Sequence, residues 1–242
     1  MSMLYFYTIV ATALLIFLYC VIVKFPKLAI EYEQTKNSDL FKKAKRKNIT
    51  EIIYSAFPFA VLIIVIKIVF YDVVTIPSGS MLPNYPIGSM VFIDKSEFGI
   101  RSPLTGKPIS EGRYPHLGEA VVTKFPLNPD VLYIKRVVGL PGDVVELSSS
   151  GLVINNIEYP FEPAGQKEML VKELPVMHDL YSIAIGDIKY QVMVDVNKPF
   201  PTIERYVVPK DSFYLLGDNM TGSGDSRMYG AVPWRYFIGS AI

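Results

Sequence analysis

Three short segments of the sequence carry residue types that can perform nucleophilic chemistry. IPSGSMLPNY (76–85) places Ser80 on a small turn beside a glycine. YIKRVVGLPGD (133–143) places Lys135 in a run of apolar, β-forming residues. GDNMTGSGDSRMYGAVP (217–233) is a polar, glycine-rich loop in which Asp225 and Arg227 are spaced for a local ion pair. A serine hydroxyl becomes a good nucleophile when a base takes its proton, and a lysine can be that base when burial lowers its pKa.

Each segment also has an ordinary structural interpretation. Taken singly, the first fits a plain turn, the second a surface lysine lying along an apolar face, and the third a polar loop. The two histidines, His116 and His178, stand in no motif-like setting, although a Ser-His-Asp triad assembles in space rather than in sequence. The sequence has no HExxH or P-loop motif and no Cys/His cluster for zinc, which leaves only a loose carboxylate site for a hard metal.

Taken together and in this order, the segments resemble the catalytic boxes of type I signal peptidases, the membrane-bound leader peptidases of bacteria. PSGSMLP (77–83) resembles the nucleophile box, 133–143 the general-base box and 217–233 the late box, while LGEAVVTKFP (117–126) matches a further box more loosely. The resemblance covers nearly the whole chain and is weakest across 148–203. The sequence departs from the family pattern at Tyr85, Ser89, Glu119 and Met220, of which Tyr85 stands near the expected substrate pocket.

The resemblance implies a serine endopeptidase that uses a Ser/Lys dyad, with Ser80 as the nucleophile and Lys135 as the general base. It implies that Ser78 and the backbone N–H of Ser80 form the oxyanion hole, and that Ser223 orients the lysine. The remaining residues of the late box are expected to support the site, through an ion pair between Asp225 and Arg227 and a turn at Asp218 and Asn219.

The implied substrate is an exported preprotein whose N-terminal signal peptide is cleaved after small residues. Its extended segment would add to a strand edge beside the dyad. Alternate side chains would enter two shallow pockets near Ile76, Pro77, Met81, Tyr133 and Ile134. The family needs no metal or organic cofactor, and none is expected here.

A mostly-β domain, barrel-like or sandwich-like, is predicted after residue 71 and would position these segments. Runs rich in Val, Ile, Tyr and Phe alternate with turn signals, of which LPGD (140–143) and Asn155–Asn156 are the clearest. No amphipathic helix of three turns is predicted there. We expect the catalytic domain at 72–147 and 204–242, and a smaller β subdomain or an insertion at 148–203. The predicted strands cover 90–95, 119–125, 131–140, 143–149, 152–159, 188–194, 204–209 and 212–218.

Two apolar segments precede this domain. Residues 4–23 carry no charge and residues 52–71 only Lys67, and a bilayer core of about 30 Å needs about 20 helical residues. We therefore predict transmembrane segments at 1–23 and 52–71. A cleavable signal peptide is the alternative for the first, but its apolar run is long and no basic region precedes it. A buried core helix is the alternative for the second.

The loop between these segments, 24–51, is rich in lysine and is predicted to be cytoplasmic. Everything after Tyr71 would then lie outside the cytoplasm. With the resemblance, this indicates a multi-pass protein of the bacterial inner (cytoplasmic) membrane whose catalytic domain is periplasmic. The expected partners are exported preprotein signal peptides, the lipid bilayer and the protein-export (translocation) machinery.

The composition excludes several other classes. The chain has 242 residues, a net charge of +1, one cysteine and a mean hydropathy of +0.30. These values argue against a disordered chain, a disulfide scaffold and a nucleic-acid binder. Two alternatives remain open: a specialised Ser/Lys processing peptidase of a pilus or conjugation system, and a membrane-anchored β-domain that binds partners without catalysis. A self-cleaving Ser/Lys repressor shares related catalytic boxes, but the two apolar segments and the absence of a DNA-binding pattern argue against it.

Overall fold

The computed structural model describes residues 70–100, 109–171 and 174–242, together with residues 59, 62, 63 and 66. The predicted segment 1–23 and loop 24–51 lie outside these residues, as does most of the predicted segment 52–71. Tyr71, the last residue of that segment, instead begins the first strand and pairs with Asp94. Within the described residues, no helix is both long and apolar enough to cross a membrane.

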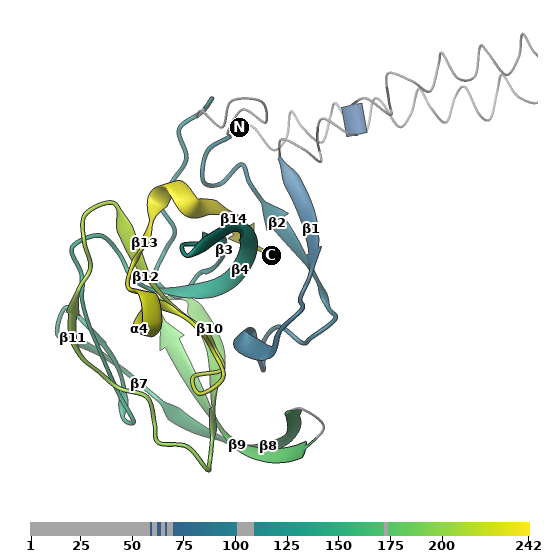
Figure 1. Cartoon of the computed structure of the whole chain (residues 1–242). Helices are drawn as coiled ribbons and strands as arrows, with labels where there is room; N and C mark the ends of the chain where they lie inside the picture. The colour runs from purple at the N-terminus through teal and green to yellow at the C-terminus, as the bar shows by residue number, and fades with distance from the viewer. Residues whose placement is uncertain (1–58, 60–61, 64–65, 67–69, 101–108, 172–173) are drawn as a thin grey trace, which may run out of the picture. The chain divides into compact units, whose positions relative to one another are not determined.

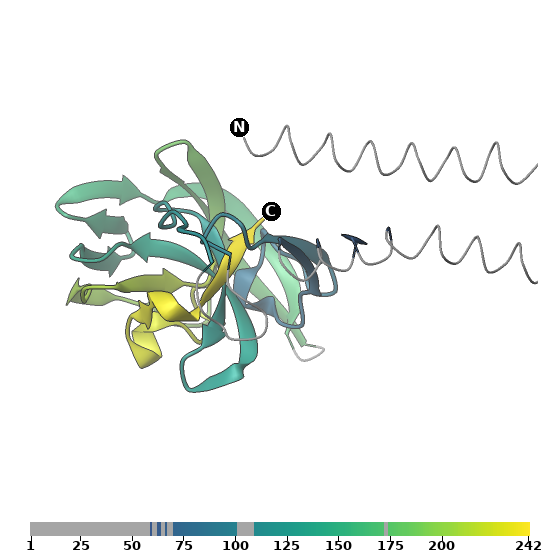
Figure 2. The same ribbon diagram turned by 90° about the horizontal axis from the view of Figure 1, so that it is seen from above.

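Residues Val69–Ile242 form one compact unit, and its described part is built mainly of antiparallel strands (Figures 1 and 2). The mostly-β prediction is therefore confirmed. The largest sheet has seven strands in the order β1 (Tyr71–Thr75), β2 (Met90–Asp94), β14 (Phe237–Ala241), β3 (Ala120–Phe125), β4 (Asn128–Gly139), β12 (Ser212–Leu216) and β13 (Val232–Pro233).

Two smaller sheets complete the domain. The four-stranded sheet has the order β11 (Ile203–Val207), β5 (Val144–Ser148), β6 (Gly151–Ile154) and β7 (Ile157–Pro160). The three-stranded sheet has the order β10 (Ile188–Asp195), β9 (Leu174–Ile185) and β8 (Glu162–Val171). Described helices of the domain are single turns: η2 (Gly79–Met81), α4 (Ser226–Tyr229) and η3 (Trp234–Tyr236).

The two predicted turns have the backbone that their residues favour. Gly142 has φ 90°, as the third position of a type II turn requires, and the N–H of Asp143 donates to the carbonyl of Leu140 at 3.0 Å. Asn155 and Asn156 both have positive φ, 51° and 66°, which suits the two-residue hairpin turn between β6 and β7.

Residues 148–203 contain more strand than their sequence suggested. Within this stretch, β8 and β9 form a long hairpin, and every residue of β10 pairs with a residue of β9. One hydrophobic cluster joins this stretch to the flanking strands, since Ile183 and Val192 pack with Val138, Val208 and Leu216. The separate subdomain or insertion proposed for 148–203 stays a prediction, but its strands share a core with β4 and β12.

Strand β4 connects the surface to the core. Its first residues, 128–132, are exposed, and the β3–β4 hairpin projects from the domain (Figure 2). Its last residues are buried, with Val137 in a second, aromatic-rich cluster around Phe213 and Phe237 and Val138 in the first cluster. Because neighbouring side chains of a strand point to opposite faces, Lys135 and Arg136 enter different environments at the start of the buried half.

Candidate active site

Lys135 lies on β4 opposite Val121 of β3, and only 2% of its surface is exposed. Its Nζ lies 2.8 Å from Ser80 Oγ and donates to the carbonyl of Ile134 at 2.9 Å. The Tyr133 ring lies 5.0 Å from Nζ. The structure thus brings together two residues 55 positions apart, which the sequence predicted as nucleophile and base.

Burial makes Lys135 able to act as a base. Desolvation lowers the pKa of its amine from 10.5 to about 8, although the carboxylates of Asp225 and Asp218 act in the opposite direction. Arg227 adds a smaller lowering effect. A neutral amine at the position of Nζ can accept the hydroxyl proton of Ser80, so this pair can perform base-assisted nucleophilic attack.

Ser80 sits in the short helix η2, directly after β1. The Ser78 hydroxyl lies within 3.5 Å of Ser80 Oγ, so both hydroxyls face the same space. Among the described residues, the N–H of Ser80 donates to no carbonyl outside the helix η2. The Ser78 hydroxyl, which donates to Ser80 Oγ, and the Ser80 N–H thus both lie beside the nucleophile, as expected for an oxyanion hole.

The late loop, residues 217–233, packs against the nucleophile turn, residues 76–85, which carries Ser80. Arg227 binds both carboxylate oxygens of the fully buried Asp225, at 2.8 and 2.6 Å, and Asp225 also accepts from the N–H of Gly217 at 3.0 Å. A Cβ at Gly217 would lie 2.5 Å from the carbonyl oxygen of Ser80 and would overlap Ser223 Oγ. Only glycine lets the loop pack so closely against the nucleophile turn.

Ser223 lies in this same crowded region, but its expected bond to the lysine is not formed in the structure. Its Oγ is buried and has no hydrogen-bond partner among the described residues, while Nζ of Lys135 is bonded to Ser80 and Ile134. The lysine-orienting role of Ser223 therefore stays a prediction.

An ion pair that the sequence did not reveal lies next to the dyad. Arg136 makes two hydrogen bonds of 2.7 Å to Asp218, and the two side chains are almost fully buried. Asn84 donates to the same carboxylate at 2.7 Å and to the carbonyl of Gln191. Asp218 was expected in a turn, and its side chain in addition links β4 to Asn84, which follows the nucleophile helix η2. The only sequence signal was an arginine beside an apolar strand and an aspartate after one.

This pairing keeps Arg136 charged. Burial alone would lower the pKa of its guanidinium, but the hydrogen-bonded carboxylate of Asp218 outweighs burial, and the pKa is raised above its ordinary value. The guanidinium also lies 3.8 Å from the centre of the Tyr190 ring. Tyr85 belongs to this buried region, since Arg136 and Asp218 both act on its hydroxyl, whose pKa burial raises.

A pocket of about 520 Å³ opens beside the dyad. It contains all five residues predicted to contact substrate, whereas Tyr85, expected near the pocket, is not part of its lining. The walls come from the end of β1, the nucleophile turn, the outer half of β4 and two glycines of the late loop. They comprise Val74, Thr75, Ile76, Pro77, Ser78, Gly79, Ser80, Met81, Val122, Val131, Leu132, Tyr133, Ile134, Lys135, Gly222 and Gly224.

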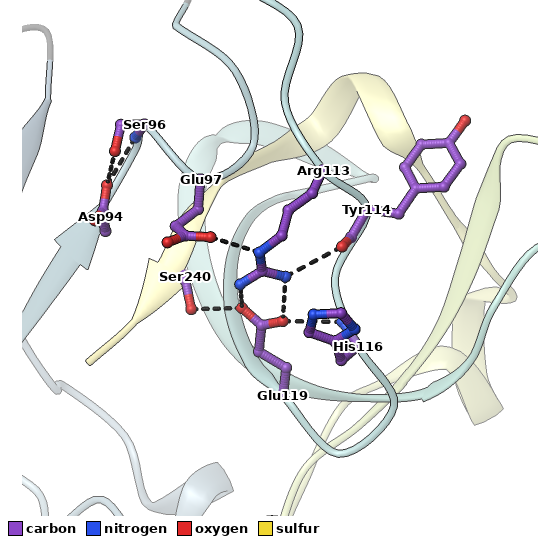
Figure 3. A network of polar contacts seen from close by, with 8 residues as sticks. All are labelled: Asp94, Ser96, Glu97, Arg113, Tyr114, His116, Glu119 and Ser240. Atoms are coloured by element: carbon purple, nitrogen blue, oxygen red, sulfur yellow. Dashed lines mark hydrogen bonds and ion pairs between the residues drawn. The ribbon is translucent and has the colours of Figure 1, made fainter. Parts of the chain in front are cut away.

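The loosely matched box, residues 117–126, contributes Glu119 to a network of hydrogen bonds. Glu119 accepts two hydrogen bonds from Arg113, one from the Ser240 hydroxyl and one from the N–H of His116 (Figure 3). Arg113 also binds Glu97, so the network fastens the segment before β3 to strand β14. These hydrogen bonds of Glu119 do not involve Ser80 or Lys135.

The described residues offer little support for the other chemistries. His178 is buried and its Nδ1 lies 3.0 Å from the carbonyl of Val176, and neither histidine is hydrogen-bonded to Ser80. No group of three or more His, Cys, Asp or Glu side chains that could hold a metal ion occurs in the part of the chain that the structure describes.

Comparison with known proteins gives consistent matches. The model of the family described as signal peptidase, peptidase S26, matches residues 49–242. A signal peptidase I of Pseudomonas fluorescens is 30% identical over 200 residues, which cover 78% of this chain and 69% of that protein. A signal peptidase I of Rickettsia massiliae is 30% identical over 228 residues, with 86% and 82% covered. Among solved structures, a signal peptidase I of Enterococcus faecalis is 21% identical with a TM-score of 0.34, covering 53% of this chain and 97% of its own.

Proposed function

Because the chain belongs to the signal peptidase family, peptidase S26, we propose that it is a serine endopeptidase that cleaves N-terminal signal peptides from exported preproteins. Cleavage follows small residues and uses Ser80 and Lys135. The observation that carries this proposal is the 2.8 Å contact between Ser80 Oγ and the amine of Lys135, a residue that is only 2% exposed. Both residues line the pocket.

The reaction proceeds in two acyl-transfer steps. Neutral Lys135 takes the hydroxyl proton as Ser80 Oγ attacks the scissile carbonyl carbon. The oxyanion that forms accepts hydrogen bonds from the Ser80 N–H and the Ser78 hydroxyl. Lys135 then gives its proton to the leaving amine, which releases the mature protein. A water molecule, activated by the amine of Lys135, then hydrolyses the acyl-Ser80 ester and releases the signal peptide.

The pocket walls support recognition of an extended segment. Strand β1 is an edge strand of the described sheet, and residues 132–134 of β4 pair with β3 on one side and with no described strand on the other. An extended peptide can add beside residues 73–75 of β1 or beside residues 132–134 of β4. The apolar walls formed by Ile76, Met81 and Ile134 lie close to Ser80 and restrict the adjacent substrate side chains to small ones.

The anchoring of the enzyme is part of the same proposal. The apolar segments 1–23 and 52–71 would hold it in the bacterial inner membrane, with the loop 24–51 in the cytoplasm and the catalytic domain outside. Ser80 follows the second segment by nine residues. The site would thus be tethered near the height at which a membrane-held signal peptide presents its cleavage point, beside the translocation machinery.

Cleavage of a preprotein by the purified chain in detergent tests this function. Ser80→Ala and Lys135→Ala should each reduce kcat/KM by about 10⁴-fold or more, because either change removes one half of the nucleophile–base pair. Ser89→Ala in the nucleophile loop and Lys124→Ala on β3 are the matched controls and should cleave normally, since neither side chain lines the pocket.

Two results would reject the dyad: full activity in either Ser80→Ala or Lys135→Ala. A wild-type chain that cleaves no preprotein would instead favour a β-domain that only binds partners. Loss of activity in His116→Ala or His178→Ala, with the fold intact, would favour a Ser-His mechanism.

A further inference from the structure

Asn219 holds two successive carbonyl groups of the nucleophile turn. Its side-chain Nδ2 donates to the carbonyl oxygen of Gly79 at 3.1 Å, and its backbone N–H donates to the carbonyl oxygen of Ser80 at 3.1 Å. The residue is buried, with 8% of its surface exposed. The sequence had indicated only a turn at this position.

The bond to Gly79 acts on the donor that the oxyanion needs. The carbonyl of Gly79 and the N–H of Ser80 belong to one planar peptide unit and point in opposite directions. Fixing the oxygen at one end therefore fixes the direction of the N–H at the other end. The N–H of Leu82 donates to the same oxygen at 3.2 Å, so the peptide plane is held by two donors.

The late loop is shaped to keep the amide of Asn219 in place. A Cβ at Gly222 would lie 2.5 Å from Nδ2, and a Cβ at Gly217 would lie 2.5 Å from the carbonyl oxygen of Ser80, so both glycines make room for these contacts. The loop is also anchored to β10 on either side of Asn219. The N–H of Met193 donates to the backbone carbonyl of Asp218, and the N–H of Met220 donates to the backbone carbonyl of Met193.

We propose that Asn219 is a positioning residue for the oxyanion hole, holding the Gly79–Ser80 peptide so that the Ser80 N–H faces the developing oxyanion. The inference rests on the proposed function and adds a residue that touches neither the substrate nor the reacting atoms. This role requires, at position 219, a side chain of about the length of asparagine whose end donates a hydrogen bond to the Gly79 carbonyl. Leucine and aspartate have similar size but cannot donate, so each should release the peptide plane.

Asn219→Leu tests the proposal in the full chain. We expect kcat for preprotein cleavage to fall about 10- to 100-fold with KM within about twofold, because the change misdirects a donor that acts in the transition state; deleting such a donor costs about 10²–10³. The pH at which kcat/KM levels off should stay at the wild-type value, since Lys135 keeps its surroundings. Thr221→Val is the control, because Thr221 lies in the same loop but accepts from the N–H of Asp195.

A peptide aldehyde gives a second measurement. Ser80 Oγ adds to its carbonyl carbon while Lys135 takes the hydroxyl proton, which leaves an oxyanion in the hole. Its affinity should fall in Asn219→Leu by the same factor as kcat, while the affinity of the cleaved product peptide stays unchanged. If Asn219→Leu does not fold, Asn219→Asp takes its place; its carboxylate repels the Gly79 oxygen and should lower the aldehyde affinity at least as much.

The outcomes separate this inference from the proposed function. Absent wild-type cleavage, or cleavage by Ser80→Ala, would overturn the function. With those results as expected, three findings would overturn the role of Asn219: kcat within twofold of wild type, an equal loss in Thr221→Val, or unchanged aldehyde affinity. A crystal structure of Asn219→Leu with the Gly79–Ser80 peptide in its original orientation would also overturn it.

Discussion

Strand β4 buries two basic residues at consecutive positions, Lys135 and Arg136, whose side chains lie on opposite faces of the strand. Their pKa values shift in opposite directions. On one face, Lys135 contacts a serine hydroxyl, a carbonyl and an aromatic ring, and it forms no ion pair with a carboxylate of the described residues. On the other face, Arg136 makes a two-pronged ion pair with Asp218. The pKa of Lys135 falls to about 8, whereas that of Arg136 rises.

The difference shows that burial alone does not decide the charge of a basic residue. Both side chains lose water, but only Arg136 has a hydrogen-bonded counter-ion that compensates for it. The chemistry of each side chain fits its face, because a guanidinium matches a carboxylate with two hydrogen bonds and does not deprotonate, while an amine gives up its proton readily. One face of β4 thus supplies a base, and the other holds the supporting elements together.

The largest effect is expected from removing the counter-ion of Arg136. Asp218→Ala leaves a buried, unpaired guanidinium and should lower the free energy of unfolding by about 3–5 kcal/mol. Denaturant unfolding measures this, with the exposed Asp130→Ala as the control, which should change the value by less than about 0.5 kcal/mol. The double variant Arg136→Met/Asp218→Leu should recover most of the loss. An unfolding free energy near that of the wild type in Asp218→Ala would contradict the role given to the pair.

A change of opposite sign is expected on the other face. The folded chain lowers the pKa of Lys135 from 10.5 to about 8, so below pH 8 folding must bury an ammonium at a cost of about 3 kcal/mol. Lys135→Met removes this cost and two hydrogen bonds, each worth about 1 kcal/mol. The inactive variant should therefore be more stable than the wild type by about 1 kcal/mol at pH 6. The gain should shrink as the pH rises above 8 and become a loss of about 2 kcal/mol above pH 10.5, where only the two lost hydrogen bonds count. Thermal unfolding at several pH values measures this; a stability difference that does not depend on pH would refute the explanation.

The smallest effect is expected from a change in the pKa of the base, Lys135. In the wild type, kcat/KM should rise about tenfold per pH unit below the pKa of Lys135 and level off above about pH 8, because only the neutral amine is active. Arg227 lowers this pKa, so Arg227→Gln should move the inflection of the kcat/KM profile to higher pH. The value of kcat/KM on the high-pH plateau should change less than its value below the inflection. A pH profile from 6 to 10 measures the shift, and an inflection at the same or lower pH would exclude the effect.

The sequence predicted the parts of the molecule that have a local signal. A run rich in Val, Ile and Tyr located most of β4, and glycine and asparagine located the turns at Gly142 and Asn155–Asn156. The contact between Ser80 and Lys135 came from the resemblance, because no periodicity relates residues 55 positions apart. Strand β8 was not predicted, since its residues 162–168 are exposed on both faces and show no alternation.

The supporting contacts were beyond sequence reasoning for a different reason. Asp218 and Asn219 lie in a loop rich in Gly and Ser, where both residue types favour turns. Their partners, Arg136 and the carbonyls of Gly79 and Ser80, come from distant parts of the chain. A buried ion pair and a backbone contact depend on the tertiary arrangement, which the local pattern does not encode.

The close approach at Gly217 also bears on how this chain can evolve. Every other amino acid adds a Cβ, which would meet the carbonyl oxygen of Ser80 and the hydroxyl of Ser223. Most single-base changes of a glycine codon replace the residue, so most such mutations at this codon would disturb the nucleophile without altering any reacting group. A survey of natural variants that inspects only Ser80 and Lys135 would miss this class of inactive enzyme, and position 217 belongs beside them as a criterion for an active copy.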